Sequence, residues 1–505
     1  MNAVLPCGTN YGFKGSDNDP CFFSRGELGS PRYSCFSMHI DDKFTAFQCD
    51  QDRIEFEGIF KAAGWEYTFE PMKKVLGLSC TYFPWDGKNP VSETNGCLLR
   101  DHAQYARDGC QRFRAEIEKD EAGYNPKEVP CKPGLADEIN KAGLLPVEQH
   151  CPKRESTYRS MLGYLNHTCQ FHHVELSFAV SLAGSFMANP SDLHMTLVRN
   201  IFQYLLGTLS KDTAHQSKIL RKDPALFMPN SVVTVMCDAD LGAAWNHRSR
   251  TAYFGFLYGN LVGSRSRLQP AVSLSTAEAE FMALAEASRF ALWLKRLLID
   301  FGLEVMATAP ALVLGDNKSA QKIAKSPMQQ KNSRHINRRL FWIKEKILDG
   351  TIMVQFVPTD SNISDIGTKA LAKAKFIPFR DWLFNGFKRA WQTTPGFVFD
   401  AKMTTVANYL TEFLSTWMEC KETWLPELSA FLSTWMECKE TDLDATIYLT
   451  MPLPDLNSHW NEYLTPTARD ARPRHQQWRR TTSTPEDAAL MAAVSDTVYS
   501  SKSRI

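Results

Sequence analysis

The sequence predicts an α/β protein whose main domain is a mixed five-stranded sheet flanked by helices. Val232–Cys237 is a nearly continuous apolar, β-branched run, which suits a strand buried on both faces. Two more β-type runs, Thr251–Tyr258 and Leu261–Ser264, are separated by Gly259-Asn260, a signal for a tight hairpin. Helical patterns then alternate with two short apolar runs, so we expect helices on the faces of the sheet.

The elements after the hairpin are expected in the order helix, strand, two helices, strand, helix. Ser275-Thr-Ala-Glu278 has the spacing of a capping box and should begin a long amphipathic helix. Ala311–Leu314 and Ile352–Val357 are expected to be strands, the second closed by Pro358. Further helices are expected at Asn317–Ile323, at Arg334–Leu348 and around Asp365.

The rest of the chain divides into three segments. Residues 1–150 carry short apolar runs between turn signals, which predicts a partial α+β region. Residues 151–225 show apolar residues at helical spacing, so we expect helices there, punctuated by Pro190 and Gly207. The sheet segment then covers residues 226–385, and residues 386–505 form the last segment.

The last segment contains an internal duplication. Phe413–Thr423 recurs unchanged as Phe431–Thr441, at an offset of 18 residues (431 − 413). This offset is about five helical turns, so the repeat keeps its apolar residues on one face, and we expect two helices divided at Pro426. A recent tandem duplication is a simpler explanation than a selected binding face. Beyond Asp455 the polar, basic composition predicts a disordered tail, with nucleic-acid contact as the alternative.

Composition restricts the class of protein. The 505 residues suffice for about three domains, and 44% hydrophobic residues suffice for real cores. A net charge of +1 argues against a nucleic-acid-packaging protein, so a nucleic-acid site would be a local patch. The sequence shows neither a signal-peptide pattern nor a membrane-spanning apolar run, and its 13 cysteines form no C-x-x-C pair. We therefore expect an intracellular protein of the cytoplasm or nucleus with no membrane partner.

Four acidic residues fall at or near element ends: Asp238, Glu280, Asp316 and Asp365. The ends of neighbouring strands can converge at one edge of a sheet, where clustered carboxylates repel one another and raise their own pKa values. Two divalent cations, Mg²⁺ or Mn²⁺, would remove that repulsion and could cleave a phosphodiester. Taken singly, each acid has a plainer explanation, as a helix cap or a solvated helix charge.

Several short motifs lie between Tyr11 and Phe384. They are Tyr158–Gly163, Phe178–Leu182, Cys237-Asp-Ala-Asp240, Leu274–Leu284 with its Ser-Thr-Ala-Glu-Ala-Glu run, Gly315–Ala320, Arg334-His-Ile336 and Asp365–Ala370. Together they resemble the C-terminal part of a copia-type retrotransposon Pol polyprotein, and the Ser-Thr-Ala-Glu-Ala-Glu run is highly specific. The resemblance implies an RNase H fold at 226–385, after a truncated reverse transcriptase palm and thumb-like region at 1–150 and a helical connection at 151–225.

The resemblance also implies an activity: hydrolysis of the RNA strand of an RNA/DNA hybrid with two Mg²⁺ or Mn²⁺ ions. By this analogy Asp238 contacts both ions, Glu280 and Asp316 complete the site of one, and Asp365 holds the other. Two alternatives stay open. A decayed element could bind nucleic acid without cutting it, and an integrase shares the fold but has a different order of acids.

Two further sets of residues follow from the resemblance and the residue pattern. Asp41 and Asp42 fall where the paired metal-binding aspartates of the polymerase belong. The fingers and the other palm carboxylate are missing, so polymerase activity is not expected of this chain alone. Arg334, His335 and Arg338 could meet the phosphates of a hybrid strand, with a solvated helix face as the alternative.

Overall fold

A computed structural model gives the structure of the protein. It describes residues 12–26, 32–39, 42–47, 49–64, 67–70, 73–75, 77–83, 95–120, 123–209, 216–220, 232–302, 307–325, 337–385 and 448–452. The chain divides into two compact units, Met1–Pro454 and Asp455–Ile505. The duplicated segment and the basic tail lie outside the described residues, which include only one strand of the last segment, β15 (Tyr448–Pro452).

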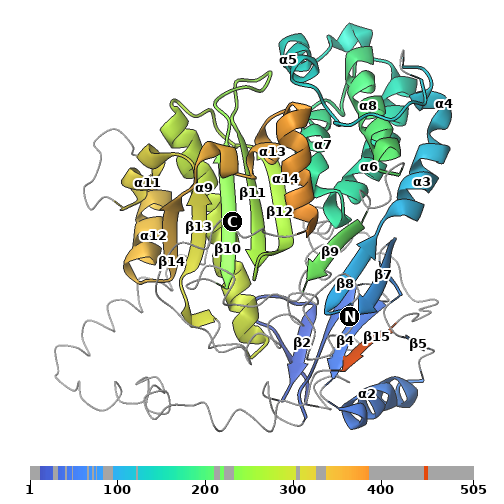
Figure 1. Ribbon diagram of the computed structural model, residues 1–505, viewed down its shortest axis with the longest axis vertical. Coiled ribbons are helices and arrows are strands. Elements are labelled where there is room, and N and C mark those ends of the chain that lie inside the picture. Colours follow the sequence, from blue (N-terminus) through green and yellow to red (C-terminus); the bar gives the residue numbers. More distant parts are fainter. Residues whose placement is uncertain are drawn as a thin grey trace, which may run out of the picture. The chain divides into compact units, whose positions relative to one another are not determined.

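A mixed five-stranded sheet forms the centre of residues 226–385, as the sequence predicted (Figure 1). Its strands stand in the order β12 (Asn260–Leu268), β11 (Arg250–Leu257), β10 (Val233–Ala239), β13 (Ala311–Gly315) and β14 (Ile352–Phe356). The strands β10, β11 and β12 pair antiparallel, whereas β13 is parallel to β10 and β14 is parallel to β13. The apolar, β-branched run predicted as the first strand is β10, the central strand.

Helices cover both faces of this sheet. They are α9 (Thr276–Asp300), α11 (Lys318–Lys325), α12 (Asn337–Leu348), α13 (Asp365–Thr368) and α14 (Lys373–Asn385). Tyr253 of β11 packs against Phe290 of α9, with ring centroids 4.9 Å apart. Its neighbours Ala252 and Phe254 lie instead next to Gly367 of α13. Because successive residues of a strand point to opposite faces, α9 and α13 lie on opposite sides of β11.

The hairpin between β11 and β12 turns one residue earlier than the sequence predicted. Leu257 pairs with Asn260, so the turn residues are Tyr258 and Gly259 rather than Gly259 and Asn260. Both have positive φ angles, 46° at Tyr258 and 75° at Gly259. A tight turn with two positive φ angles matches the right-handed twist of the strands, and this geometry places a tyrosine where asparagine or glycine is usual.

The long helix α9 begins where the capping-box spacing predicts. Ser275 is the N-cap, and its side chain accepts a hydrogen bond from the backbone N–H of Glu278. The carboxylate of Glu278 in turn accepts from the N–H of Leu274, at 2.9 Å. Two backbone donors at the helix start are thereby satisfied, which fixes the point at which the helix leaves the edge of the sheet.

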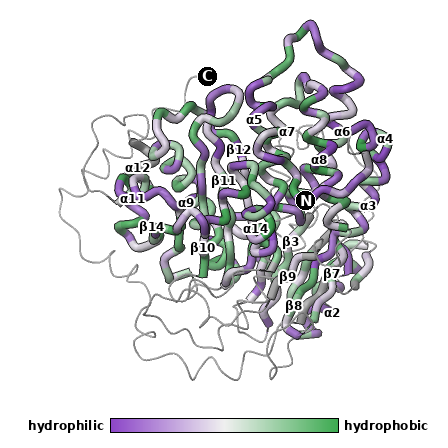
Figure 2. The backbone as a smooth tube through the Cα atoms, turned by 45° about the horizontal axis from the view of Figure 1, so that its top comes forward, coloured by the Kyte–Doolittle hydropathy of each residue, from purple (hydrophilic) through white to green (hydrophobic). Residues whose placement is uncertain are grey.

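Three helices precede the sheet: α6 (Pro152–Phe171), α7 (Ser177–Gly184) and α8 (Asp192–Leu209). Hydrophobic and hydrophilic residues alternate along their turns, as expected for helices with one buried face (Figure 2). Gly207 lies within α8 rather than at its end, and a Cβ there would meet the backbone carbonyl of Lys127. One continuous hydrophobic core includes residues of these helices and of the five-stranded sheet.

Two further sheets contain mainly N-terminal residues. The first has the order β1 (Lys14–Gly15), β2 (Phe22–Arg25), β3 (Ser34–His39), β4 (Asp42–Phe47), β15, β5 (Phe69–Glu70), and the second has the order β6 (Lys74–Val75), β7 (Leu78–Phe83), β8 (Cys97–Asp101), β9 (Gln216–Leu220). The accompanying helices are α2 (Asp50–Ala62), α3 (Ala103–Arg112), α4 (Arg114–Ile117) and α5 (Pro133–Ala142). Within the described ranges, no helix is long and apolar enough to cross a membrane.

Gly255 of β11 gives a test of the packing between the sheet and α9. A Cβ at this position would meet the ring of Phe290, so Gly255→Ala should lower the free energy of unfolding by about 1–3 kcal/mol through overpacking. Phe290→Leu in the same chain should recover part of the loss, because the smaller side chain leaves room for the added methyl group. Urea unfolding of the two single variants and the double variant measures this coupling.

Gly163 of α6 serves as the matched control. No atom lies within 4 Å of a Cβ built there, and the residue is exposed within a helix. Gly163→Ala should therefore raise the free energy of unfolding by up to about 1 kcal/mol through helix propensity. Equal effects of alanine at both positions would contradict the packing argument.

Candidate active site

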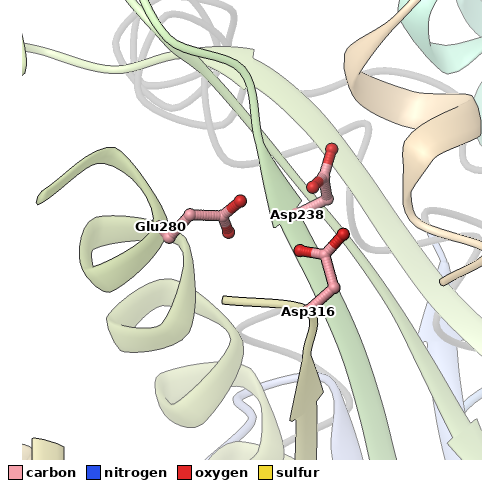
Figure 3. Close-up of side chains that lie close together, drawn as sticks. All are labelled: Asp238, Glu280 and Asp316. Carbon is pink, nitrogen blue, oxygen red and sulfur yellow. The ribbon is translucent and has the colours of Figure 1, made fainter. Parts of the chain in front are cut away.

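Three of the four predicted acids meet at one edge of the five-stranded sheet. Asp238 lies near the end of β10, Asp316 directly follows β13, and Glu280 lies in the second turn of α9 (Figure 3). One carboxylate oxygen of each lies within 4.8 Å of those of the other two. These residues are the one group of possible metal ligands found in the part of the chain that the structure describes.

Strand register explains why Asp238 and Asp316 meet. The parallel strands β10 and β13 pair Met236 with Leu314, and each aspartate lies two residues further along the chain, Asp238 within β10 and Asp316 directly after β13. Residues at equal register on neighbouring strands point to the same face, so the two carboxylates lie side by side at the carboxyl edge. Glu280 joins them because α9 packs across both strands.

Burial makes the three charges costly in the absence of a cation. Asp238 and Glu280 are buried, and Asp316 is half-buried. Desolvation, together with the charges of Asp238 and Asp316, raises the pKa of Glu280 to about 9. Desolvation likewise raises the pKa of Asp238 to about 6, against the opposing attraction of Lys369.

The donor set fits a divalent cation. Oδ1 of Asp238 is buried and has no hydrogen-bond partner among the described residues. Oxygen ligands of this kind suit Mg²⁺ or Mn²⁺. A bound cation would satisfy the orphaned oxygen and would remove the repulsion that raises the pKa of Glu280.

Neighbouring donors fix the orientations of the carboxylates. The hydroxyl of Thr368 donates to Oδ2 of Asp238, and the hydroxyl of Thr359 donates to Oδ2 of Asp316 at 2.8 Å. Glu280 accepts a hydrogen bond from the backbone N–H of Ala239. Each acid is therefore held by at least one donor, which limits its rotamers.

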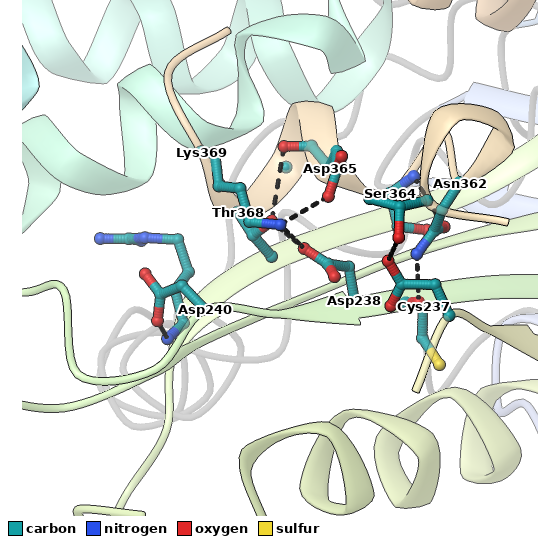
Figure 4. Close-up of polar contacts among 12 residues, drawn as sticks. Cys237, Asp238, Asp240, Asn362, Ser364, Asp365, Thr368 and Lys369 are labelled. Atoms are coloured by element: carbon teal, nitrogen blue, oxygen red, sulfur yellow. Dashed lines mark hydrogen bonds and ion pairs between the residues drawn. The ribbon is translucent and has the colours of Figure 1, made fainter. Parts of the chain in front are cut away.

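The fourth predicted acid, Asp365, lies apart from this group of three. Its buried carboxylate forms two ion pairs. Nζ of Lys369 lies 2.7 Å from Oδ1, and Nζ of Lys375 contacts Oδ2. The Nζ atom of Lys369 also lies 3.4 Å from Oδ2 of Asp238, between the two aspartates (Figure 4). Neither lysine was predicted from the sequence, although Asp365 and Lys369 have the i,i+4 spacing of a helical ion pair.

The turn that carries Asp365 is fastened to the end of β10. The side-chain amide of Asn362 donates to the carbonyl of Cys237 at 3.1 Å. The carbonyl of Gly367 accepts from the hydroxyl of Ser266 in β12 at 2.7 Å. These bonds place α13 over the face to which Asp238 points, so the positions of Thr368 and Lys369 follow from the fold.

The remaining predicted site residues cannot be placed at the side-chain level. Asp41, Arg334 and His335 lie outside the described residues. Asp42 begins β4 and Arg338 lies in α12, where the structure describes only the backbone. Their roles in metal and nucleic-acid binding stay predictions.

The raised pKa of Glu280 predicts how the stability of the metal-free protein depends on pH. A carboxyl group whose pKa rises on folding stabilises the protein below its unfolded pKa of about 4.5, and this stabilisation is lost as the pH rises toward 9. Glu280→Gln removes that loss. In EDTA the variant should match the wild type near pH 4 and exceed its free energy of unfolding by a few kcal/mol at pH 8, measured by urea unfolding.

Glu286→Gln is the control on the same helix. Glu286 pairs with Arg267 near the surface, so its removal should not stabilise the protein at either pH. Added Mn²⁺ at pH 8 should raise the free energy of unfolding of the wild type but not that of Glu280→Gln, because ligand binding stabilises only a fold that holds the ligand. A pH-independent difference between wild type and Glu280→Gln would refute the buried-charge explanation.

Comparison with curated proteins shows similarity to retrotransposon Pol polyproteins. Over 231 residues the chain is 30% identical to "Retrovirus-related Pol polyprotein from transposon TNT 1-94" of Nicotiana tabacum, covering 46% of this chain and 16% of the relative. It is 26% identical over 223 residues to the Pol polyprotein from transposon RE1 of Arabidopsis thaliana, covering 44% and 14%. It is 21% identical over 276 residues to the Transposon Ty1-NL2 Gag-Pol polyprotein of Saccharomyces cerevisiae, covering 53% and 15%.

The matched part is thus at most 16% of the length of these three relatives. No family model matches the chain. Among solved structures, it matches the N-terminal RNase H domain of rv2228c from Mycobacterium tuberculosis, solved as a fusion with maltose-binding protein. That match has 14% identity and a TM-score of 0.19, and it covers 30% of this chain and 96% of the other. In sequence, about half of the chain is similar to a part of retrotransposon Pol polyproteins.

Proposed function

We propose that residues 226–385 form an RNase H-like domain that hydrolyses the RNA strand of an RNA/DNA hybrid and depends on a divalent metal ion. The observation that carries this proposal is the convergence of Asp238, Glu280 and Asp316 at the carboxyl edge of a mixed five-stranded sheet. These acids occupy three motifs that resemble copia-type Pol polyproteins. The similarity to curated Pol polyproteins supports the same family of activities.

The three carboxylates would hold the metal ion. When bound there, Mg²⁺ or Mn²⁺ would activate water and stabilise the leaving oxygen of a phosphodiester. Thr368 and Thr359 support this role, because each hydroxyl donates to Oδ2 of one aspartate and so fixes its orientation. Glu280 must lose its proton to act as a ligand, so metal affinity should rise with pH up to about 9.

The two segments before the sheet also have assigned roles. Residues 151–225 would serve as a connection, since their helices share a core with the sheet. Residues 1–150 would be a remnant of a reverse transcriptase palm. Arg334, His335 and Arg338 would contact the phosphates of the hybrid.

Asp316→Asn tests the catalytic assignment. This substitution removes one ligand charge while keeping the size of the side chain, so cleavage of a labelled RNA/DNA hybrid in Mg²⁺ should fall by at least about a hundredfold. The control is Asp360→Asn, an exposed aspartate in the loop before Asp365, which should cleave like the wild type. A gel assay with both variants at equal concentration measures the rates.

The assay also separates cleavage from binding alone. If the wild type retains hybrid in a mobility-shift experiment but never cuts it, the domain is a binding module and the enzymatic proposal is wrong. If Asp316→Asn cuts as fast as the wild type, the nuclease site lies elsewhere.

A further inference from the structure

The Asp365 side of the site already contains positive charge. The Asp365 carboxylate is only 2% exposed, and an ionised group so deeply buried requires a compensating cation. Lys369 and Lys375 supply one at each of its oxygens. The ammonium of Lys369 also reaches Oδ2 of Asp238. It therefore contacts the two carboxylates that, in the sequence-based expectation, share the second metal ion.

The other side of the site differs in this respect. Among the described residues, neither Glu280 nor Asp316 forms an ion pair, whereas Asp238 and Asp365 both contact Lys369. The two oxygens of Asp238 have different surroundings. Oδ2 contacts Thr368 and Lys369, whereas Oδ1 is buried without a hydrogen-bond partner among the described residues.

We propose that the Lys369 ammonium takes the place of the second divalent cation, so that the chain binds one divalent ion at Asp238, Glu280 and Asp316 and a lysine at Asp238 and Asp365. This inference rests on the proposed function, because it concerns the metal content of the same site. A second divalent ion at Asp365 would have to displace the ammonium or lie beside a like charge.

The fold holds Lys369 in this position. Lys369 follows the last residue of α13, one helical turn after Asp365, so both side chains extend from the same side of the turn. Thr368, its neighbour, is bonded to Asp238, and Asn362 fastens the turn to the end of β10. The short helix α13 therefore positions both Asp365 and Lys369.

Metal stoichiometry tests the proposal directly. Mn²⁺ binding to the full chain would be measured from the free Mn²⁺ signal in electron paramagnetic resonance, for the wild type, Lys369→Gln and Lys369→Arg. The control is Lys373→Gln, because Lys373 is exposed and pairs with Glu128 rather than with the site. Circular dichroism and urea unfolding would verify that each variant is folded.

We expect one Mn²⁺ per chain for the wild type, Lys369→Arg and Lys373→Gln, and two for Lys369→Gln, whose bound Mn²⁺ should show the spectrum of a coupled pair. Adding Asp365→Asn to Lys369→Gln should return the stoichiometry to one. If Lys369→Gln fails to fold, the wild-type spectrum tests the proposal by itself. The proposal then requires the wild type to show a single, uncoupled Mn²⁺ ion.

The failure of this inference can be distinguished from failure of the proposed function. Two Mn²⁺ ions of similar affinity in a wild type that cleaves hybrid would refute the role of Lys369 and leave the nuclease proposal intact. A single ion in folded Lys369→Gln would also refute it. No Mn²⁺ binding in any variant, with hybrid uncut, would overturn both proposals.

Discussion

Repulsion among buried carboxylates is the constraint on which this site depends. Parallel pairing of β10 with β13 places Asp238 and Asp316 at equal register, and the packing of α9 adds Glu280. The fold gains nothing in stability from this arrangement, because desolvation raises the pKa of Glu280 to about 9. Other interactions in the fold must offset the free-energy cost of these buried carboxylates. Strongly shifted pKa values of this kind are typical of functional sites.

The surroundings compensate this cost unequally. Hydroxyl donors and a backbone N–H form hydrogen bonds to the three acids, but these bonds add no full positive charge. Charge compensation is concentrated at Asp365, which lies between two lysines. Among the residues that the structure describes, Asp365 therefore has cationic partners, whereas Glu280 and Asp316 have none. This asymmetry comes from the short helix α13, whose first residue is the acid and whose turn ends at Lys369.

The sheet and the three acids that cluster could be predicted from the sequence, but the residues that surround these acids could not. β10 and α9 could be predicted because a β-branched run and a capping box are local signals. The hairpin was displaced by one residue because Tyr258 adopts a positive φ angle, which no propensity favours for tyrosine. Gly207 looked like a helix end, yet close approach of the Lys127 backbone is what requires a glycine there. Lys369 was missed because its two partners lie far apart in sequence.

The two aspartates of the Cys237–Asp240 motif have different contacts. Asp238 belongs to the group of three acids, whereas Asp240 is connected through Arg250 to helix α7. Asp238 lies in β10, and Asp240 directly follows the last residue of this strand. Asp240 accepts from the backbone N–H of Arg250, and the buried guanidinium of Arg250 donates to Ser181 of α7. Burial lowers the pKa of Arg250 to about 10, and the negative charge of Asp240 opposes this shift. Asp240 and Arg250 therefore connect the end of β10 to the helical segment with which the sheet shares a core.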